Sequence, residues 1–282
     1  MDNIMSIVWA VVWFAFLGGA FGLLLAIAAK VFYVKTDPRV DEITGLLPGA
    51  NCGGCGYAGC AALADAIAKG EAKCTACVAG SEEVANSIAK IMGVEAEQLV
   101  RMRAQVMCSG APWLVDKKYI YAGAKDCYAA SKMSGGDKRC PNGCIGLGTC
   151  VASCVFDAIH IENGVAVVDY DKCQACGRCV EACPKHIIKL IPFHSTHWVG
   201  CMSVDKGAIT RSYCKVGCIS CKKCEKTCQH GAIKVTDFVA SIDYEKCVHC
   251  GECVEVCPRK IIWSDKSQSI AVTIDPGHVE NA

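Results

Sequence analysis

Residues 218–258, CISCKKCEKTCQHGAIKVTDFVASIDYEKCVHCGECVEVCP, decide the fold, because their eight cysteines form two runs of the pattern C-x2-C-x2-C-x3-C. Cysteines this close in sequence are poor disulfide partners for one another, but they can converge on one metal centre. The whole chain has 25 Cys among 282 residues. So many thiols indicate a reducing compartment, since extracellular oxidation would threaten them.

A second copy of this stretch lies 74 residues upstream. Residues 157–173, DAIHIENGVAVVDYDKC, correspond to residues 231–247, GAIKVTDFVASIDYEKC. Nine cysteine pairs keep the same offset without a gap. They are Cys127 with Cys201, Cys140 with Cys214, Cys144 with Cys218, Cys150 with Cys224, Cys154 with Cys228, Cys173 with Cys247, Cys176 with Cys250, Cys179 with Cys253, and Cys183 with Cys257. The chain therefore holds a duplicated module.

The module resembles a bacterial two-cluster ferredoxin, in which three cysteines of one run bind one [4Fe–4S] cluster and the fourth binds its neighbour's. The resemblance implies two ligand sets in the second copy: Cys218, Cys221, Cys224 and Cys257, and Cys247, Cys250, Cys253 and Cys228. Zinc is the alternative occupant of a four-cysteine set. Alternating residues predict strand pairs at 158–161 with 165–168, and 233–235 with 239–242. Asn163-Gly164 is a strong turn signal.

The first copy departs from this pattern at one position. Leu147 occupies the place of Cys221. One set remains complete, namely Cys173, Cys176, Cys179 and Cys154. The other retains Cys144, Cys150 and Cys183 and needs a substitute, for which Cys140 is the nearest candidate.

An uncharged run at residues 4–29 predicts a membrane anchor. About 20 apolar residues span a bilayer, so the run is long enough with some tilt. The alternative is a cleaved signal peptide, against which stand Asp2 and the lack of Lys or Arg before the run. Lys30, Lys35 and Arg39 follow it, so the positive-inside rule predicts a single-pass protein of the inner (cytoplasmic) membrane with its cysteines in the cytoplasm.

Between anchor and repeat, residues 45–80 carry another cysteine cluster on a Gly-rich loop: Cys52, Cys55 and Cys60, with a fourth ligand from Cys74 or Cys77. Helices are expected over 61–69, from Ser81 to about Met92, and over 95–107. The stretch resembles the Fes domain, a small helical four-iron module. That resemblance implies Cys77 as the fourth ligand, although Ala79 replaces a usual proline, and leaves Cys74 spare.

Five clusters would use 20 cysteines and leave five over. Four of these, Cys108, Cys127, Cys201 and Cys214, could hold a sixth [4Fe–4S] cluster. Buried free thiols are the alternative, because free Cys is commonly buried.

The order of anchor, Fes-like segment and ferredoxin repeats resembles the B subunit of Rnf complexes, in the long, cysteine-rich form of anaerobes. We therefore expect an α+β chain with four parts: an anchor at 1–30, a helical [4Fe–4S] domain at 31–110, and ferredoxin-like modules at 111–195 and 196–282. The resemblance implies electron transfer from reduced ferredoxin to the other subunits of a complex that reduces NAD+ and translocates Na+ or H+. The chain shows no dinucleotide or Walker motif, and no catalytic residue is expected on it.

Other interpretations keep part of this chemistry. They are a polyferredoxin subunit of a membrane hydrogenase or formate dehydrogenase, a zinc-binding structural module, and an activator of corrinoid proteins. A formal net charge of +1 gives no sign of nucleic-acid binding. Basic residues gather near one cluster run and form either a docking site for ferredoxin or an ordinary solvated surface: Lys215, Lys222, Lys223 and Lys226, with Glu225 opposing them.

Overall fold

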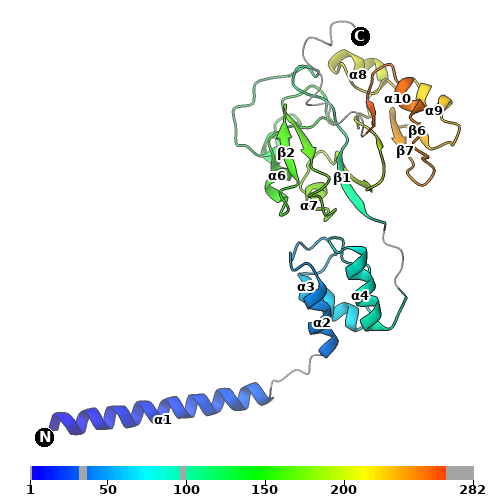
Figure 1. Ribbon diagram of the computed structural model, residues 1–282. Coiled ribbons are helices and arrows are strands. Elements are labelled where there is room, and N and C mark those ends of the chain that lie inside the picture. The colour runs from blue at the N-terminus through cyan, green and yellow to red at the C-terminus, as the bar shows by residue number, and fades with distance from the viewer. Residues whose placement is uncertain (1, 32–36, 96–99, 265–282) are drawn as a thin grey trace.

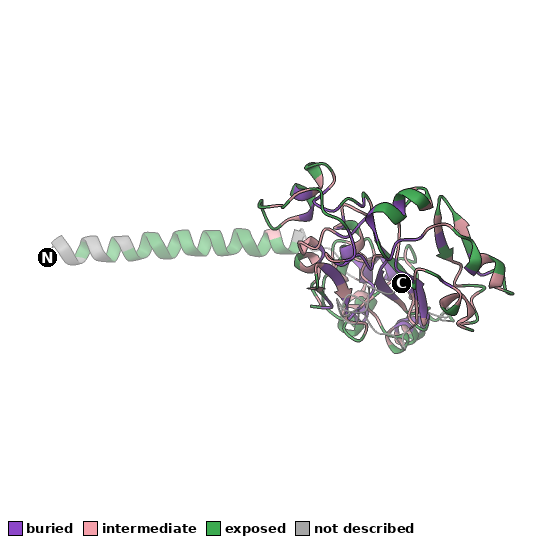
Figure 2. Ribbon diagram, turned by 90° about the horizontal axis from the view of Figure 1, so that it is seen from above, coloured by how far each residue is buried: buried purple, intermediate pink, exposed green. Residues whose placement is uncertain are grey.

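The computed structural model describes residues 2–31, 37–95 and 100–264. Helix α1 (Asp2–Val31) stands apart from the other elements (Figure 1). Within the described residues it is the one helix long and apolar enough to cross a membrane, over Val11–Lys30, and none of that window is buried (Figure 2). An exposed apolar surface of this length suits lipid, as expected for an anchor.

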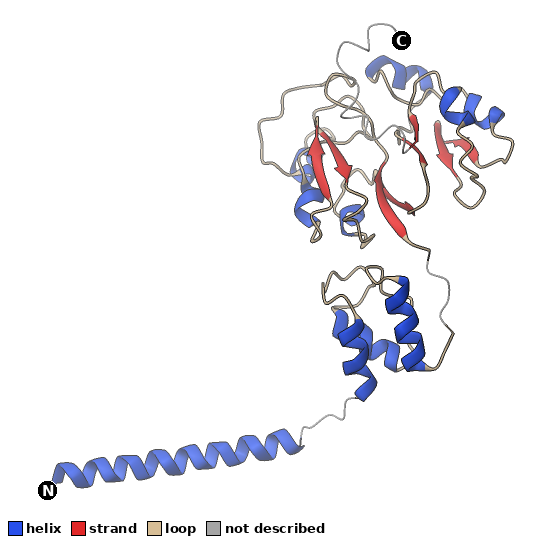
Figure 3. Ribbon diagram, viewed as in Figure 1, coloured by secondary structure: helices blue, strands red, loops and turns tan. Residues whose placement is uncertain are grey.

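A small helical domain follows, built from α2 (Pro38–Leu46), α3 (Cys60–Ala68) and α4 (Glu82–Met92) (Figure 3). The predictions of α3 and α4 are confirmed, including the Ser81 cap, whose hydroxyl accepts a hydrogen bond from the Val84 amide at 3.4 Å. Helix α2 was not predicted. The three helices bury a common apolar core that includes Ile43, Leu63, Ile67 and Ile88.

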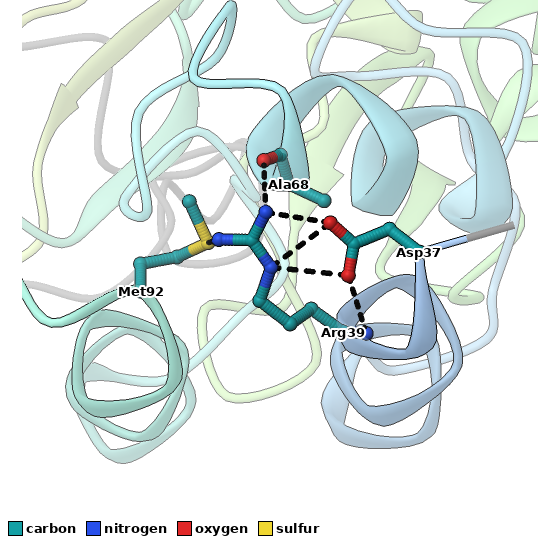
Figure 4. Close-up of polar contacts among 4 residues, drawn as sticks. All are labelled: Asp37, Arg39, Ala68 and Met92. Atoms are coloured by element: carbon teal, nitrogen blue, oxygen red, sulfur yellow. Dashed lines mark hydrogen bonds and ion pairs between the residues drawn. The ribbon is translucent and has the colours of Figure 1, made fainter.

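Arg39 ties the three helices together (Figure 4). Its guanidinium pairs with Asp37 at 2.5 Å, and the same Nη2 donates to the Ala68 carbonyl at the end of α3 at 3.2 Å. Nη1 also lies 3.9 Å from the Met92 sulfur at the end of α4. Arg39 thus joins the start of one helix to the ends of the other two.

The helix expected over 95–107 is wrong. Residues 96–99 lie outside the described part of the chain, and Met102–Val106 form strand β1. Strand β1 pairs antiparallel with β4 (Ile188–Pro192), with Val106 opposite Ile188. The apolar spacing that suggested a helix instead serves a strand whose partner lies about 85 residues away in sequence. Residues 102–106 therefore pack with the first ferredoxin-like module.

The rest of the first module consists of α5 (Cys127–Lys132), α6 (Thr149–Ser153), β2 (Ile159–Glu162), β3 (Val165–Val168) and α7 (Arg178–Glu181). Strands β2 and β3 form the predicted hairpin. Its turn residues Asn163 and Gly164 both have positive φ, 47° and 67°, as a two-residue turn of this type requires.

The second module repeats this plan with β5 (His197–Val199), α8 (Gly207–Tyr213), α9 (Lys223–Thr227), β6 (Ile233–Thr236), β7 (Val239–Ile242), α10 (Glu252–Glu255) and β8 (Ile262–Ser264). Strands β6 and β7 form the second predicted hairpin, and β5 pairs with β8 as β1 does with β4. These outer strand pairs were not predicted. Each module closes around its own core, and cysteine side chains make up much of both cores.

Candidate metal centres

Cysteine side chains gather at six places in the structure. We number the groups in their spatial order. Group 1 is Cys52, Cys55, Cys60 and Cys77; group 2 is Cys154, Cys173, Cys176 and Cys179; group 3 is Cys127, Cys144, Cys150 and Cys183; group 4 is Cys108, Cys140, Cys201 and Cys214; group 5 is Cys218, Cys221, Cys224 and Cys257; and group 6 is Cys228, Cys247, Cys250 and Cys253.

Groups 2, 5 and 6 have the composition that the ferredoxin pattern predicts. Each lines a cavity of 350–380 Å³. Burial raises the pKa of Cys179 to about 12, and the thiolates of Cys173, Cys176 and Cys154 raise it further. In the same way the pKa of Cys224 is raised by burial and then by Cys218, Cys257 and Cys221, and that of Cys253 by burial and then by Cys247, Cys250 and Cys228. The four sulfurs of each group thus face one another.

The cavities fit a cluster better than a single ion. A zinc ion needs its ligand sulfurs about 2.3 Å from one point. Within the described part of the chain, no three His, Cys, Asp or Glu side chains converge that closely on one ion. A [4Fe–4S] cube spreads its four cysteines over separate corners, which suits sulfurs that surround a cavity.

Group 3 differs from the sequence-based expectation. Its cavity of about 360 Å³ is lined by Cys144, Cys150, Cys183 and Cys127, and Cys140 is absent from this lining. Burial raises the pKa of Cys150 to about 12, and the next causes are the thiolates of Cys144 and Cys127. The structure therefore brings Cys127, rather than Cys140, to the position that Leu147 leaves without a ligand.

Helix α5 holds Cys127 at this cavity. Asp126 caps α5 by accepting from the Ala129 amide at 2.9 Å. Thr149, at the start of α6, donates to the Asp126 carboxylate at 2.8 Å, and its hydroxyl accepts from the Cys127 amide at 2.7 Å. These bonds fasten α5 to the helix that carries Cys150.

Cys140 belongs to group 4, which draws ligands from both modules. Burial raises the pKa of Cys140 to about 11, followed by the effect of the Cys108 thiolate. The pKa of Cys214 rises to about 12 through burial and then through Cys108 and Cys140. For Cys201 it also rises to about 12, with burial first and Cys108 among the further causes. The set expected for a sixth cluster is thus changed at one member, with Cys140 in place of Cys127.

Backbone hydrogen bonds show which cysteines are equivalent in the two modules. The Cys108 sulfur accepts from the amides of Gly110 and Cys144, each at 3.4 Å. The Cys201 sulfur accepts from the amides of Ser203 at 3.5 Å and Cys218 at 3.3 Å. Cys201 therefore corresponds in space to Cys108, although the constant offset in sequence pairs it with Cys127.

A length difference explains the mismatch. Cys108 and Cys140 lie 32 residues apart, whereas Cys201 and Cys214 lie 13 apart, so the first module carries 19 extra residues. These residues hold α5 and Cys127. The gapless offset is genuine from Cys140 onward, and its extension to Cys127 is a coincidence of spacing.

Group 1 lies in the helical domain. Burial raises the pKa of Cys77, the amides of Ala79 and Gly80 lower it, and the thiolates of Cys60 and Cys55 raise it again. The pKa of Cys74 is raised by burial, with no other cysteine among its causes. Cys77 therefore faces the loop cysteines, which agrees with the ligand choice that the Fes resemblance implied. Cys52, on the same loop, remains a prediction.

The six groups adjoin one another in a series. Cys52 of group 1 acts on the pKa of Cys176 of group 2, and Cys179 of group 2 acts on that of Cys150 of group 3. The amide bonds to the sulfurs of Cys108 and Cys201 link group 4 to groups 3 and 5. Groups 5 and 6 meet at α9, where the Cys228 amide donates to the Cys224 carbonyl at 3.1 Å.

Three family models match parts of the chain. They describe a putative Fe-S cluster at residues 47–79, a 4Fe-4S binding domain at 166–189 and a 4Fe-4S dicluster domain at 217–261. These matches support [4Fe–4S] clusters in the helical domain and in both modules.

Three proteins are similar over most of the chain. The B subunit of the Na+-translocating ferredoxin:NAD+ oxidoreductase complex of Acetobacterium woodii is 49% identical over 88% of this chain and 75% of its own. The B subunit of the ion-translocating oxidoreductase complex of Methanosarcina acetivorans is 43% identical over 87% of this chain and 94% of its own. The B subunit of the proton-translocating ferredoxin:NAD+ oxidoreductase complex of Clostridium ljungdahlii is 40% identical over 91% and 92%.

Proposed function

The chain belongs to the family of the B subunits of ion-translocating oxidoreductase complexes, the Rnf family, and on that premise we propose that it is the membrane-anchored electron relay of such a complex. It accepts electrons from reduced ferredoxin and passes them to other subunits, which reduce NAD+ and translocate Na+ or H+. The chain contributes to this oxidoreductase without substrate chemistry of its own. The observation that carries the proposal is the unbroken series of six cysteine groups.

Each group holds one [4Fe–4S] cluster in this proposal. A bound cluster supplies reversible one-electron chemistry. The residues of the chain hold the cluster, exclude water from it and donate hydrogen bonds to its sulfurs. Amide donors of this kind, such as those on Cys108 and Cys201, are among the factors that set a cluster's potential. Six clusters extend the five that the repeat and the Fes-like loop imply.

Group 4 is the bridge in this relay. Cys108 and Cys140 come from the first module, and Cys201 and Cys214 from the second. Without a centre there, the sequence of neighbouring groups would be interrupted between groups 3 and 5. A centre shared by both modules also explains why Ser109, next to Cys108, donates its amide to the Gly200 carbonyl at 3.0 Å.

The relay leads toward the membrane. The helical domain with group 1 follows α1, and Lys30 lies in the last turn of that helix. With Lys or Arg flanking its C-terminal end, the positive-inside rule favours a cytoplasmic side for everything after α1. Reduced ferredoxin is a cytoplasmic carrier in this scheme, and group 1 is the delivery end next to the membrane subunits.

Iron and acid-labile sulfide counts test the proposal. The full-length chain, purified anaerobically in detergent and reconstituted with iron and sulfide, should hold about 24 irons. Cys214→Ser should hold about 20, because it removes a ligand of the bridge, whereas Cys74→Ser should match the unaltered chain. Reduced ferredoxin should bleach the whole visible absorbance of the unaltered chain but leave part of it in Cys214→Ser on the same time scale. Zinc without sulfide in the unaltered protein would refute the relay.

A further inference from the structure

Two cysteines among the six groups are exposed to solvent: Cys221 of group 5 and Cys250 of group 6. Electron tunnelling slows steeply with distance, so a separate donor protein has to approach a centre near the surface. The face around each of these cysteines is therefore a possible entry point, and the two faces differ in charge.

The face around Cys221 is basic. Lys222 and Lys223 follow it directly, and Lys226 lies one helical turn further along α9. All three side chains are exposed. The nearest acid, Glu225, is half-buried and pairs only loosely with Lys222, at 4.0 Å. Electrostatic attraction at this face thus favours a negatively charged partner.

Helix α8 extends this face. An added Cβ on Gly207 would lie 2.1 Å from the Ile219 carbonyl oxygen, so α8 packs directly against the loop that leads to Cys221. Lys206 precedes α8, and Arg211 on α8 lowers the pKa of Arg259, which lines the group 5 cavity. Ile209 on α8 is 50% exposed. We call Lys206, Arg211, Lys222, Lys223 and Lys226, with Ile209, the α8–α9 face.

The face around Cys250 has the opposite character. Glu245 and Glu255 are exposed near it, and Lys246 is paired with Asp243 at 2.8 Å. An acidic donor would meet repulsion there. Charge therefore selects Cys221 over Cys250 as the point of approach.

The first module provides an internal comparison. At the positions of Lys222, Lys223 and Lys226 it has Gly148, Thr149 and Ala152, so the basic residues are absent. Thr149 is also bonded to Asp126 and to the Cys127 amide, so α5 lies over this position. The extra residues thus close the counterpart face in the first module, while the second module leaves its own face open and basic.

We propose that a small acidic one-electron carrier protein, of the reduced ferredoxin class, docks on the α8–α9 face and reduces the group 5 centre next to Cys221. In each encounter the carrier loses one electron and the group 5 centre gains it, with no bond made or broken. The proposal rests on the relay function above and adds the entry point and its charge.

The test compares charge reversal at this face with reversal elsewhere in the same module. Lys222→Glu/Lys223→Glu changes the α8–α9 face, and Lys234→Glu changes an exposed lysine on β6. Reduced ferredoxin is mixed with each full-length, cluster-loaded protein, and absorbance bleaching gives the second-order rate constant at several salt concentrations.

The double variant should react about tenfold more slowly at low salt, and its rate should depend less on salt, because steering is lost. Lys234→Glu should stay within about twofold of the unaltered chain. Iron content and the final extent of bleaching with excess dithionite should be equal in all three proteins. A double variant that matches Lys234→Glu in rate and salt dependence would overturn the docking site and leave the relay intact. An unaltered chain that ferredoxin does not reduce at all would instead overturn the relay.

Discussion

Gly54 offers a way to weaken the first step away from the ferredoxin modules without touching a ligand. A Cβ added there would lie 2.6 Å from the carbonyl oxygen and 2.9 Å from the Cα of Cys176. Real Cβ contacts essentially never fall below 3.0 Å, so the two loops must separate by at least 0.4 Å. The atoms of Cys176 are backbone and cannot yield by a rotamer change. Gly54→Ala should therefore loosen the contact between groups 1 and 2.

Overpacking of this kind typically costs about 1–3 kcal/mol. Applied to the docking of the helical domain on the first module, that cost lowers the ratio of docked to undocked molecules by about 5- to 150-fold. Groups 2 to 6 should still be reduced at the normal rate by ferredoxin. Reduction of group 1 should become a separate, slower phase.

Stopped-flow absorbance, with rapid-freeze EPR to identify the last centre reduced, measures both phases. Gly45→Ala is the matched control, because Gly45 lies on α2 of the same domain with nothing within 4 Å of an added Cβ. Iron content should be the same in both variants. A Gly54→Ala protein whose final phase equals that of Gly45→Ala would refute the idea that electrons pass through the Cys176 contact.

Three further predictions concern the ligand exchange and local stability. Cys127→Ser and Cys140→Ser should each lower the iron count from about 24 to about 20, but EPR should show different centres lost, group 3 in the first and group 4 in the second; identical spectra would contradict the assignment. Asp126→Ala should lower the free energy of unfolding by about 0.5–2 kcal/mol in denaturant titrations, since it removes the cap of α5, whereas Asp126→Asn should lose much less. Hydrogen bonds from Arg39 hold the pKa of Asp37 below its ordinary value of 3.8, so the stability from this pair is present above that pH and is lost as the pH falls through the lowered pKa. Arg39→Ala should therefore show a smaller loss of thermal stability between neutral and acid pH than the unaltered chain.

The sequence predicted well wherever the determining residues lie close together in the chain. The Asn163-Gly164 turn and alternating residues specify a hairpin locally, and the spacing of Cys247, Cys250 and Cys253 predicts a tight loop around one centre. The confirmed hairpins, and the gathering of groups 2, 5 and 6 in space, follow from such signals.

The errors arise from contacts between distant residues. Strand β1 was expected to be helical because its partner, β4, lies far along the chain. The exchange of Cys127 and Cys140 has a similar origin, because the choice of the nearest cysteine in sequence ignored the path of the extra residues. A comparison of the distances from Cys108 to Cys140 and from Cys201 to Cys214 would have revealed the insertion.

The division of group 4 between the modules has a consequence for biogenesis. When a ribosome has completed the first module, Cys108 and Cys140 have emerged, but Cys201 and Cys214 have yet to be synthesised. Groups 1, 2 and 3 can be loaded with iron and sulfide at that stage, whereas group 4 has only half its thiols. Assembly factors must therefore keep two cysteines protected until translation is nearly finished, and premature termination between the modules would leave a reactive, half-built centre.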